Sequence, residues 1–201
     1  MEIEELDIDG AWVFTPVQHG DARGVFLETF QQSTVGQAIG HPFQLAQVNC
    51  SVSTKGTVRG IHFADVPPGQ AKYITCTTGR VLDVVVDIRI GSPTFGSWTS
   101  VILDDTARRA VYLSEGLGHG FAALEDNSTV MYLCSEPYSP TGEHGVHPMD
   151  SDLSIDWGLA TDEMELSAKD TSAPNLATAA QDGLLPDYAT CLEFRRTLAN
   201  R

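Results

Sequence analysis

Short runs of apolar residues, separated by turn-forming residues, recur through the middle of the chain between residues 44 and 136. The separators are rich in Gly, Pro, Asp and Ser, as in Pro67-Pro68-Gly69. Many short strands at this spacing indicate an all-β sandwich or barrel, because a parallel α/β fold places a helix between successive strands. The predicted strands are Gln44–Ser53, Thr57–Phe63, Lys72–Thr77, Arg80–Ile88, Ser97–Leu103, Arg109–Leu113, Gly118–Leu124 and Thr129–Ser135.

The segment before this core, residues 1–43, is interpreted as an N-terminal arm with strands at Ala11–Thr15 and Gly24–Phe30. A strand that precedes a core sheet can pair at its open edge or with another subunit. A homodimer is therefore a reasonable expectation from the pattern.

The segment after the core, residues 137–201, is loop-rich as far as Asp170 and then helical. We expect one helix that is capped by Ser172 and has Gly183 just past its end. A second helix is expected over Asp187–Ala199. Arm, core and C-terminal part together are predicted to form one domain over residues 1–201.

The composition narrows the class of protein. With 201 residues, 42% of them apolar, the chain is typical of one globular domain. No window approaches the roughly 18 apolar residues of a membrane span, and the acidic N-terminus lacks a secretory signal, so a cytoplasmic location is expected. The 12 Lys and Arg residues face 27 Asp and Glu residues, a net charge of −15. Such a chain repels nucleic acid and anionic membranes, so neither is an expected partner, and a few focused basic residues must hold any anionic substrate.

The four cysteines, Cys50, Cys76, Cys134 and Cys191, form no closely spaced pair. In an intracellular protein such thiols are expected to stay free, with those in strands packing as small apolar side chains. The chain also lacks the GxGxxG, P-loop and GxSxG motifs, so neither a nucleotide-binding α/β fold nor acyl transfer is indicated.

Three basic side chains, Arg59, His62 and Lys72, fall on neighbouring strand segments among apolar residues. Burying them is costly unless an anionic ligand or a reaction uses them, so they form a candidate site. Strict alternation would place Arg59 and His62 on opposite faces unless Gly60 introduces a bulge. A strand histidine can also be structural, and Lys72 at a strand entry can extend to water. The pattern leaves both interpretations open.

Three further residues are candidates. His119 lies among glycines and, with His62, resembles the two-histidine layout of metal-binding cupins, yet two histidines without a third ligand make a poor metal site. Tyr132 is either a buried aromatic side chain that packs in the core or a proton donor, since a neighbouring cation lowers the pKa of a phenol. Asp170 could be an exposed residue at a helix start or could orient a histidine. The spacing alone does not bring Asp170 to His62.

Short motifs run in order along most of the chain: Asp21–Glu28, Gln47–Asn49, Arg59–His62, Pro67–Lys72, Asp83–Asp87, Gly91–Trp98, Gly118–Phe121, Tyr132–Tyr138 and Ser167–Asp170. In this order they resemble the dTDP-4-dehydrorhamnose 3,5-epimerase family. The resemblance implies a cupin-type jelly roll with short C-terminal helices, a homodimer, and no metal or other cofactor. It also implies proton abstraction beside the C4 ketone of a dTDP-4-keto-6-deoxyhexose, followed by reprotonation on the opposite face.

The resemblance further implies a role for each matching residue. His62 would be the base, with Asp170 as its partner, Tyr132 the acid, and Lys72 the group that stabilises the enolate oxygen. The arm residues would reach the partner subunit's site. The implied binding residues are Arg23, Phe26, Glu28, Gln47, Asn49, Arg59, His119, Tyr138, Glu143 and Lys169.

Some stretches depart from the usual family pattern, among them Phe63-Ala64-Asp65 and Ser114–Gly118. These variants are similar to members from antibiotic-sugar pathways, some of which epimerise only C3 or only C5. The alternatives to a 3,5-epimerase are therefore a mono-epimerase at C3 or C5, a related 3,4-ketoisomerase, a non-catalytic nucleotide-sugar binding module and a metal-dependent cupin.

Overall fold

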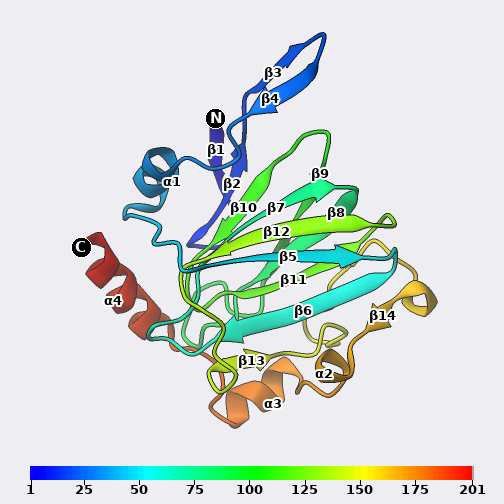
Figure 1. Cartoon of the computed structure of the whole chain (residues 1–201). Helices are drawn as coiled ribbons and strands as arrows, with labels where there is room; N and C mark the ends of the chain where they lie inside the picture. Colours follow the sequence, from blue (N-terminus) through cyan, green and yellow to red (C-terminus); the bar gives the residue numbers. More distant parts are fainter. Residues whose placement is uncertain (201) are drawn as a thin grey trace.

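Two facing antiparallel sheets form the body of the protein in the computed structural model, which describes residues 1–200 (Figure 1). The first sheet is ordered β1 (Glu2–Glu5), β2 (Ala11–Thr15), β10 (Ala110–Leu113), β7 (Lys72–Thr78), β12 (Ser128–Cys134) and β5 (Gln47–Ser53). The second is ordered β13 (Glu143–Gly145), β6 (Thr57–Ala64), β11 (Gly118–Ala123), β8 (Arg80–Val86) and β9 (Trp98–Asp104), with β14 (Glu165–Leu166) parallel to β6. The chain crosses repeatedly between the sheets, so the predicted all-β jelly roll is confirmed.

The N-terminal arm has two parts. Strands β1 and β2 extend the first sheet at its edge, as an open edge invites. The ribbon of β3 (Gln18–Asp21) and β4 (Gly24–Leu27) projects away from the body (Figure 1). Helix α1 (Gln32–Ile39), which the pattern did not predict, follows the ribbon and buries Val35 and Ile39.

The helices of the C-terminal part are α2 (Ala168–Thr171), α3 (Leu176–Gln181) and α4 (Tyr188–Ala199), preceded by the 3₁₀ turn η1 (Thr161–Glu163). The helix predicted from Asp187 is confirmed, and the Asp187 side chain accepts a hydrogen bond from the Thr190 amide. The cap predicted at Ser172 is wrong. Ser172 ends α2, and Asn175 caps α3 by accepting from the Thr178 amide. No helix within residues 1–200 has the length and apolar character to cross a membrane.

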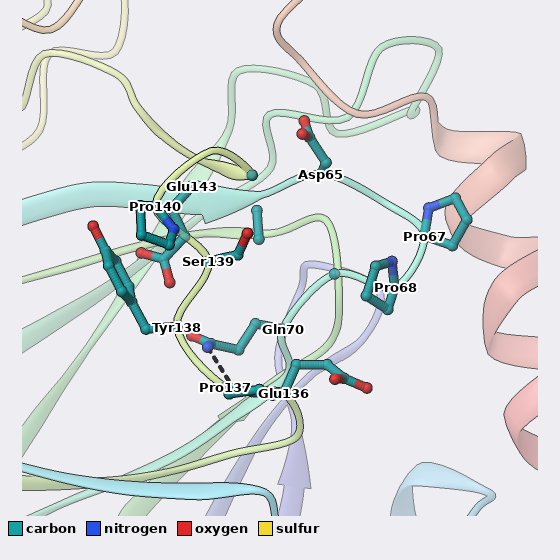
Figure 2. A pocket seen from close by; sticks show the side chains of 13 residues that line it. Asp65, Pro67, Pro68, Gln70, Glu136, Pro137, Tyr138, Ser139, Pro140 and Glu143 are labelled. Atoms are coloured by element: carbon teal, nitrogen blue, oxygen red, sulfur yellow. Dashed lines mark hydrogen bonds between the residues drawn. The ribbon is translucent and has the colours of Figure 1, made fainter.

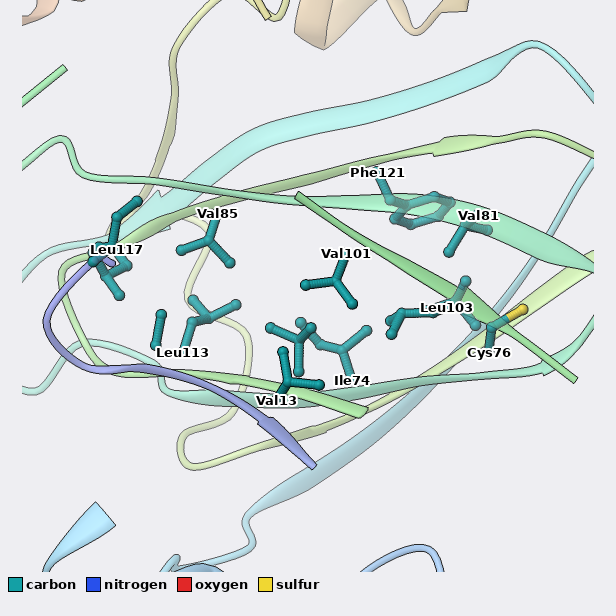
Figure 3. Close-up of a cluster of buried hydrophobic side chains, with 14 residues drawn as sticks. Val13, Ile74, Cys76, Val81, Val85, Val101, Leu103, Leu113, Leu117 and Phe121 are labelled. Atoms are coloured by element: carbon teal, nitrogen blue, oxygen red, sulfur yellow. The ribbon is translucent and has the colours of Figure 1, made fainter. Parts of the chain in front are cut away.

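The space between the two sheets is filled over most of its length by apolar side chains (Figure 3). Strand β8 is buried on both sides, because Val81 and Val85 point into this core while Val84 and Val86 point outward. Each such side chain contributes about 1.5–3 kcal/mol by leaving water. The inner core consists of Ile8, Ala11, Val13, Ile74, Cys76, Val81, Val85, Val101, Leu103, Val111, Leu113, Leu117, Phe121 and Val130.

The outer face of the second sheet is covered by the C-terminal part of the chain. Trp157, Leu176 and Leu185 pack there against residues of β6 and β8. The Trp157 indole donates to the Pro148 carbonyl, which satisfies its polar atom inside this contact. Residues that the pattern describes as loop-rich therefore act as the second wall of the core, and they bring Asp170 to β6.

The four cysteines are all free, as expected. Cys76, Cys134 and Cys191 are buried, whereas Cys50 is exposed. The expectation that strand cysteines pack in the core is wrong for Cys50, because it faces outward on β5 together with the exposed Val48 and Val52.

Candidate functional site

A bulge at one residue of strand β6 interrupts the alternation of its side chains and brings two candidate residues to the same side of the strand. His62 pairs with His119 of β11, and Arg59 pairs with Phe121, so three steps along β6 match two along β11. Gly60 absorbs the extra residue with φ +121°, and a Cβ there would lie 2.5 Å from the Gly120 Cα atom. The bulge expected at Gly60 is present.

The consequence of the bulge is that Arg59 and His62 line the same cavity, although alternation would separate them. Val58, Ile61 and Phe63 instead belong to the apolar cluster on the outer face of the second sheet, which also contains Trp157, Leu176 and Leu185. The cavity lies between the sheets, beyond the apolar core, and has a volume of about 200 Å³. Its lining residues are Arg59, His62, Lys72, His119, Phe121, Tyr132, Ser167, Lys169 and Asp170.

His62 and Asp170 are hydrogen-bonded in this cavity, with 2.6 Å between Nε2 and Oδ1. Asp170 is 4% exposed and belongs to α2, whose cap Ser167 both accepts from the Asp170 amide and donates to its Oδ2. Burial raises the pKa of Asp170, but the hydrogen bonds from His62 and Ser167 outweigh it, so the pKa ends below its usual value. The carboxylate can only accept, so Nε2 carries a proton and Nδ1 is left to take one.

Lys72 brings a cation into the cavity from the start of β7, on the opposite sheet. Burial lowers the pKa of its ammonium, partly offset by Cys134, Glu143 and Asp83. None of the ion pairs within residues 1–200 involves Lys72, so its charge is available for a ligand in the cavity. Lys72 therefore lines the cavity and does not extend to bulk water, which was the alternative that the strand pattern left open.

Tyr132 faces the cavity from β12 of the first sheet, whereas His62 faces it from β6 of the second. Burial raises the pKa of the Tyr132 phenol, and the Ser51 hydroxyl and the Arg59 charge only partly offset this. The expectation that a cation would leave the pKa of Tyr132 lowered is wrong, because burial is the larger effect. A phenol that stays protonated can still act as a proton donor.

Asp83 is a member of the site that the sequence analysis missed. Its Oδ2 atom lies 2.8 Å from Nε2 of His119, and both side chains are buried. Asp83 lies inside the jelly roll on β8, where the strand pattern predicts an apolar residue. A charged residue among valines at an inward position was the signal that could have identified it.

The remaining cations of the cavity are Arg59 and Lys169. The Arg59 Nε atom donates to the Ser53 hydroxyl, which orients the guanidinium. With Lys72, three of the chain's 12 Lys and Arg residues line one cavity of a protein with net charge −15. This focusing of positive charge is what an anionic ligand requires.

A second hollow of about 430 Å³ lies between residues 64–70 and residues 136–143 (Figure 2). Tyr138 and Glu143 line this hollow and not the first cavity. Gln70 crosses it to donate to the Glu136 carbonyl, 2.8 Å away. Glu143 influences the pKa of Lys72, which connects the two hollows electrostatically.

Gln47 and Asn49 line neither of these two hollows. The side-chain Oε1 atom of Gln47 accepts a hydrogen bond from the Tyr138 backbone amide, and its Nε2 atom donates to Asn49 Oδ1. In this chain by itself they hold the segment that carries Tyr138. Their predicted contact with a ligand stays a prediction.

The three arm residues lie on or just after the projecting ribbon, apart from the cavity of the same chain (Figure 1). Phe26 is 68% exposed. Arg23 is also exposed and pairs with Asp21. Glu28 lines a surface hollow beside α1. Within one chain the structure does not bring them to the other candidate residues.

Residues 1–200 contain no group of three or more His, Cys, Asp and Glu side chains arranged to hold a metal ion. His62 and His119 are neighbours across β6 and β11, but each is bonded to its own aspartate.

Comparison with known proteins gives consistent matches. The family model described as dTDP-4-dehydrorhamnose 3,5-epimerase matches residues 5–178. A dTDP-4-dehydrorhamnose 3-epimerase from Streptomyces niveus is 56% identical over 191 residues, covering 95% of this chain and 91% of the relative. A dTDP-4-dehydrorhamnose 3,5-epimerase from Mycolicibacterium smegmatis is 54% identical, covering 98% and 97%. The structure of ChmJ, a 3'-monoepimerase from Streptomyces bikiniensis in complex with dTDP-quinovose, has a TM-score of 0.93 and 49% identity, covering 98% of each chain.

Proposed function

The chain belongs to the dTDP-4-dehydrorhamnose 3,5-epimerase family, and on that premise we propose that His62 and Tyr132 invert a carbon of the substrate from opposite sides. The protein is an isomerase that epimerises a dTDP-linked 4-keto-6-deoxy sugar in deoxysugar biosynthesis. We propose which residues carry out this reaction and which subunit supplies each of them. The observation that carries it is the His62–Asp170 pair facing Tyr132 across one cavity.

His62 is the base in this proposal. The C4 ketone acidifies the hydrogens on C3 and C5, so a histidine suffices if the enolate is stabilised. Asp170 holds the ring through Nε2 and stabilises the imidazolium that forms when Nδ1 takes the proton.

Lys72 stabilises the enolate oxygen. Its ammonium is buried and has no ion-pair partner within residues 1–200, so it interacts with developing charge in a region of low dielectric. Lys72 stands on the sheet opposite His62, so it can reach the oxygen while His62 reaches the carbon.

Tyr132 returns a proton to the opposite face of the sugar. Inversion requires that the acid and the base lie on different sides of the planar enolate. The jelly roll supplies this, because β12 and β6 belong to facing sheets. The phenol stays protonated at neutral pH, since burial raises its pKa.

The diphosphate is held by Arg59 and Lys169, with His119 at the sugar, and Tyr138 and Glu143 in the neighbouring hollow extend the binding surface. The arm residues of the binding set come from a second copy of the chain. A homodimer would cover the exposed Val48 and Val52 on β5 and would use the arm residues Arg23, Phe26 and Glu28.

The experiment is incubation with dTDP-4-keto-6-deoxyglucose in D₂O, followed by NMR. Deuterium at C3 and C5 with inversion at both identifies a 3,5-epimerase, and inversion at C3 or C5 alone identifies a mono-epimerase. Movement of the carbonyl from C4 to C3 would identify a ketoisomerase instead. Absence of exchange at both carbons would overturn the epimerase assignment, and loss of activity with a chelator would overturn its independence of metal.

A further inference from the structure

A small cavity of about 20 Å³ adjoins the hollow of Figure 2 and is lined in part by residues of α4. Pro68 and Glu136 line both the cavity and the hollow, so they form the partition between them. Phe194 and Leu198 of α4 also line the cavity.

Two side chains that the proposed mechanism does not use also line this cavity. His41 is 6% exposed and Glu115 is 5% exposed. The Nε2 atom of His41 and the Oε2 atom of Glu115 are buried and have no hydrogen-bond partner within residues 1–200. Buried polar atoms almost always have a partner, which can be ordered water. The cavity is large enough for one water molecule, which needs roughly 10–15 Å³.

The hydrogen-bonding character of His41 follows from its neighbour. Its Nδ1 atom lies 3.1 Å from the Pro42 carbonyl, which can only accept, so Nδ1 carries a proton. Burial lowers the pKa of His41, the Pro42 carbonyl partly offsets this and Arg195 adds a further decrease, so the neutral ring is favoured. Nε2 is therefore an acceptor, and whatever faces it must donate.

Glu115 has surroundings that favour its neutral form. Burial raises its pKa to about 7, with Glu136 acting in the same direction, while its own backbone amide, Arg195 and the Ser135 hydroxyl oppose. Burial raises the pKa of the Tyr112 phenol and of the Cys191 thiol, and the charge of Glu115 acts in the same direction on both. A protonated carboxyl supplies the donor that the His41 acceptor lacks, directly or through a water, whereas a carboxylate is an acceptor only.

Glu115 also supports the loop of residues 66–70. A Cβ placed on Gly69 would lie 2.7 Å from the Glu115 Cβ atom, so the two residues are packed in direct contact. Arg195 links the other side to the N-terminal part by donating to Asp9.

We propose that His41, one buried water and the protonated carboxyl of Glu115 form a polar junction that holds residues 66–70 against α4, and that ionisation of Glu115 loosens it. Residues 66–70, which form one wall of the hollow that Tyr138 and Glu143 also line, are then more mobile above neutral pH than below it.

The first test compares unfolding of the wild type and Glu115→Gln between pH 5 and pH 8. Because the pKa of Glu115 is higher in the folded chain than its usual 4.5, its contribution to stability is lost as pH rises toward 7. The folded-to-unfolded ratio of the wild type, relative to that of E115Q, should fall by up to about tenfold per pH unit between pH 5 and 7. The exposed Glu125→Gln variant is the matched control and should parallel the wild type. A wild type that parallels E115Q would overturn the proposal.

The second test needs no variant and no substrate, so its outcome is independent of the epimerase activity. Hydrogen–deuterium exchange of residues 66–70, corrected for the intrinsic effect of pH, should be faster at pH 8 than at pH 6 in the wild type. Equal protection at both pH values would contradict the loosening. A crystal structure that shows an empty cavity between His41 and Glu115 would contradict the water.

Discussion

The Nε2 atom of His62 lies 2.6 Å from Oδ1 of Asp170, although 108 positions separate the two residues in the chain. Strand β6 positions the histidine, and the four-residue helix α2 with its Ser167 cap positions the aspartate. The orientation of the proposed base therefore depends on how the C-terminal part packs on the second sheet.

Asp170→Asn should lower kcat by a factor on the order of 10². Asparagine keeps the shape but cannot stabilise the imidazolium, and its NH₂ group can favour the wrong tautomer of His62. Steady-state kinetics with the dTDP-linked ketosugar provide the measurement. The matched control is Asp162→Asn, on an exposed residue of η1, which should retain the wild-type kcat. A wild-type kcat for D170N would contradict the proposed role of Asp170 as the partner of His62.

The same pair of residues predicts that the free energy of unfolding depends on pH in the acid range. The pKa of Asp170 is lowered in the folded chain from its usual 3.8. Its stabilising contribution is therefore present at neutral pH and is lost as pH falls through and below about 4. Urea unfolding at pH 3 to 6 should show a smaller acid-side loss of stability in D170N than in the wild type. Identical acid-side curves would contradict this sign.

Tyr132→Phe should separate proton abstraction from inversion. Without the phenol proton, His62 can still remove a substrate hydrogen and exchange it with D₂O on the same face. The rate of inversion should fall by about 10²–10⁴-fold, while exchange falls much less. His62→Asn is the comparison and should lose both. If Y132F lost exchange and inversion equally, Tyr132 would not be the acid on the far side.

Gly60→Ala should destabilise the fold and damage the site together. The backbone at Gly60 has φ +121°, and a new Cβ would lie 2.5 Å from the Gly120 Cα atom. We expect a loss of about 3 kcal/mol or more in the free energy of unfolding. Gly24 has φ +132° with nothing within 4 Å of its Cβ position. Gly24→Ala should therefore cost only the backbone strain, about 1 kcal/mol. Equal losses in the two variants would mean that contact with β11 does not require glycine.

Mixing two inactive variants tests whether the arm acts across a dimer. Phe26→Ala removes the exposed ring of the ribbon, and His62→Asn removes the base. If the arm enters the partner's cavity, a mixed dimer contains one cavity with both an intact base and an intact arm. Unfolding and refolding the two variants together should then restore about a quarter of the wild-type activity, given random pairing. No recovery, with mixed dimers demonstrated, would mean that each arm serves its own chain.

Alternation and turn residues predicted every strand of the core because these strands obey local rules. Val81, Val84 and Val86 are apolar on a strand with both faces buried, and the separators rich in Gly, Pro and Asp end each run. The helix predicted over Asp187–Ala199 is α4, and the Asp187 cap that the structure shows is also a local feature. Helix α1 was missed because it has no capping side chain and no charge pattern at its ends.

The candidate site was only partly accessible from the sequence. Gly60 signalled a possible bulge, but only the pairing of β6 with β11 decided that Arg59 and His62 face one cavity. The partner of His119 was missed because a single Asp among valines does not reveal what lies across the sheet.

The sequence by itself determined the strands between residues 44 and 136, the focusing of a few cations in an acidic chain, and the family. Tertiary structure decided which residues meet: the Asp170 carboxylate at His62, Tyr132 on the facing sheet, and the direction in which burial moves the pKa of each. The physical reason is that strand periodicity depends on neighbours in the chain, whereas hydrogen bonds and desolvation depend on neighbours in space.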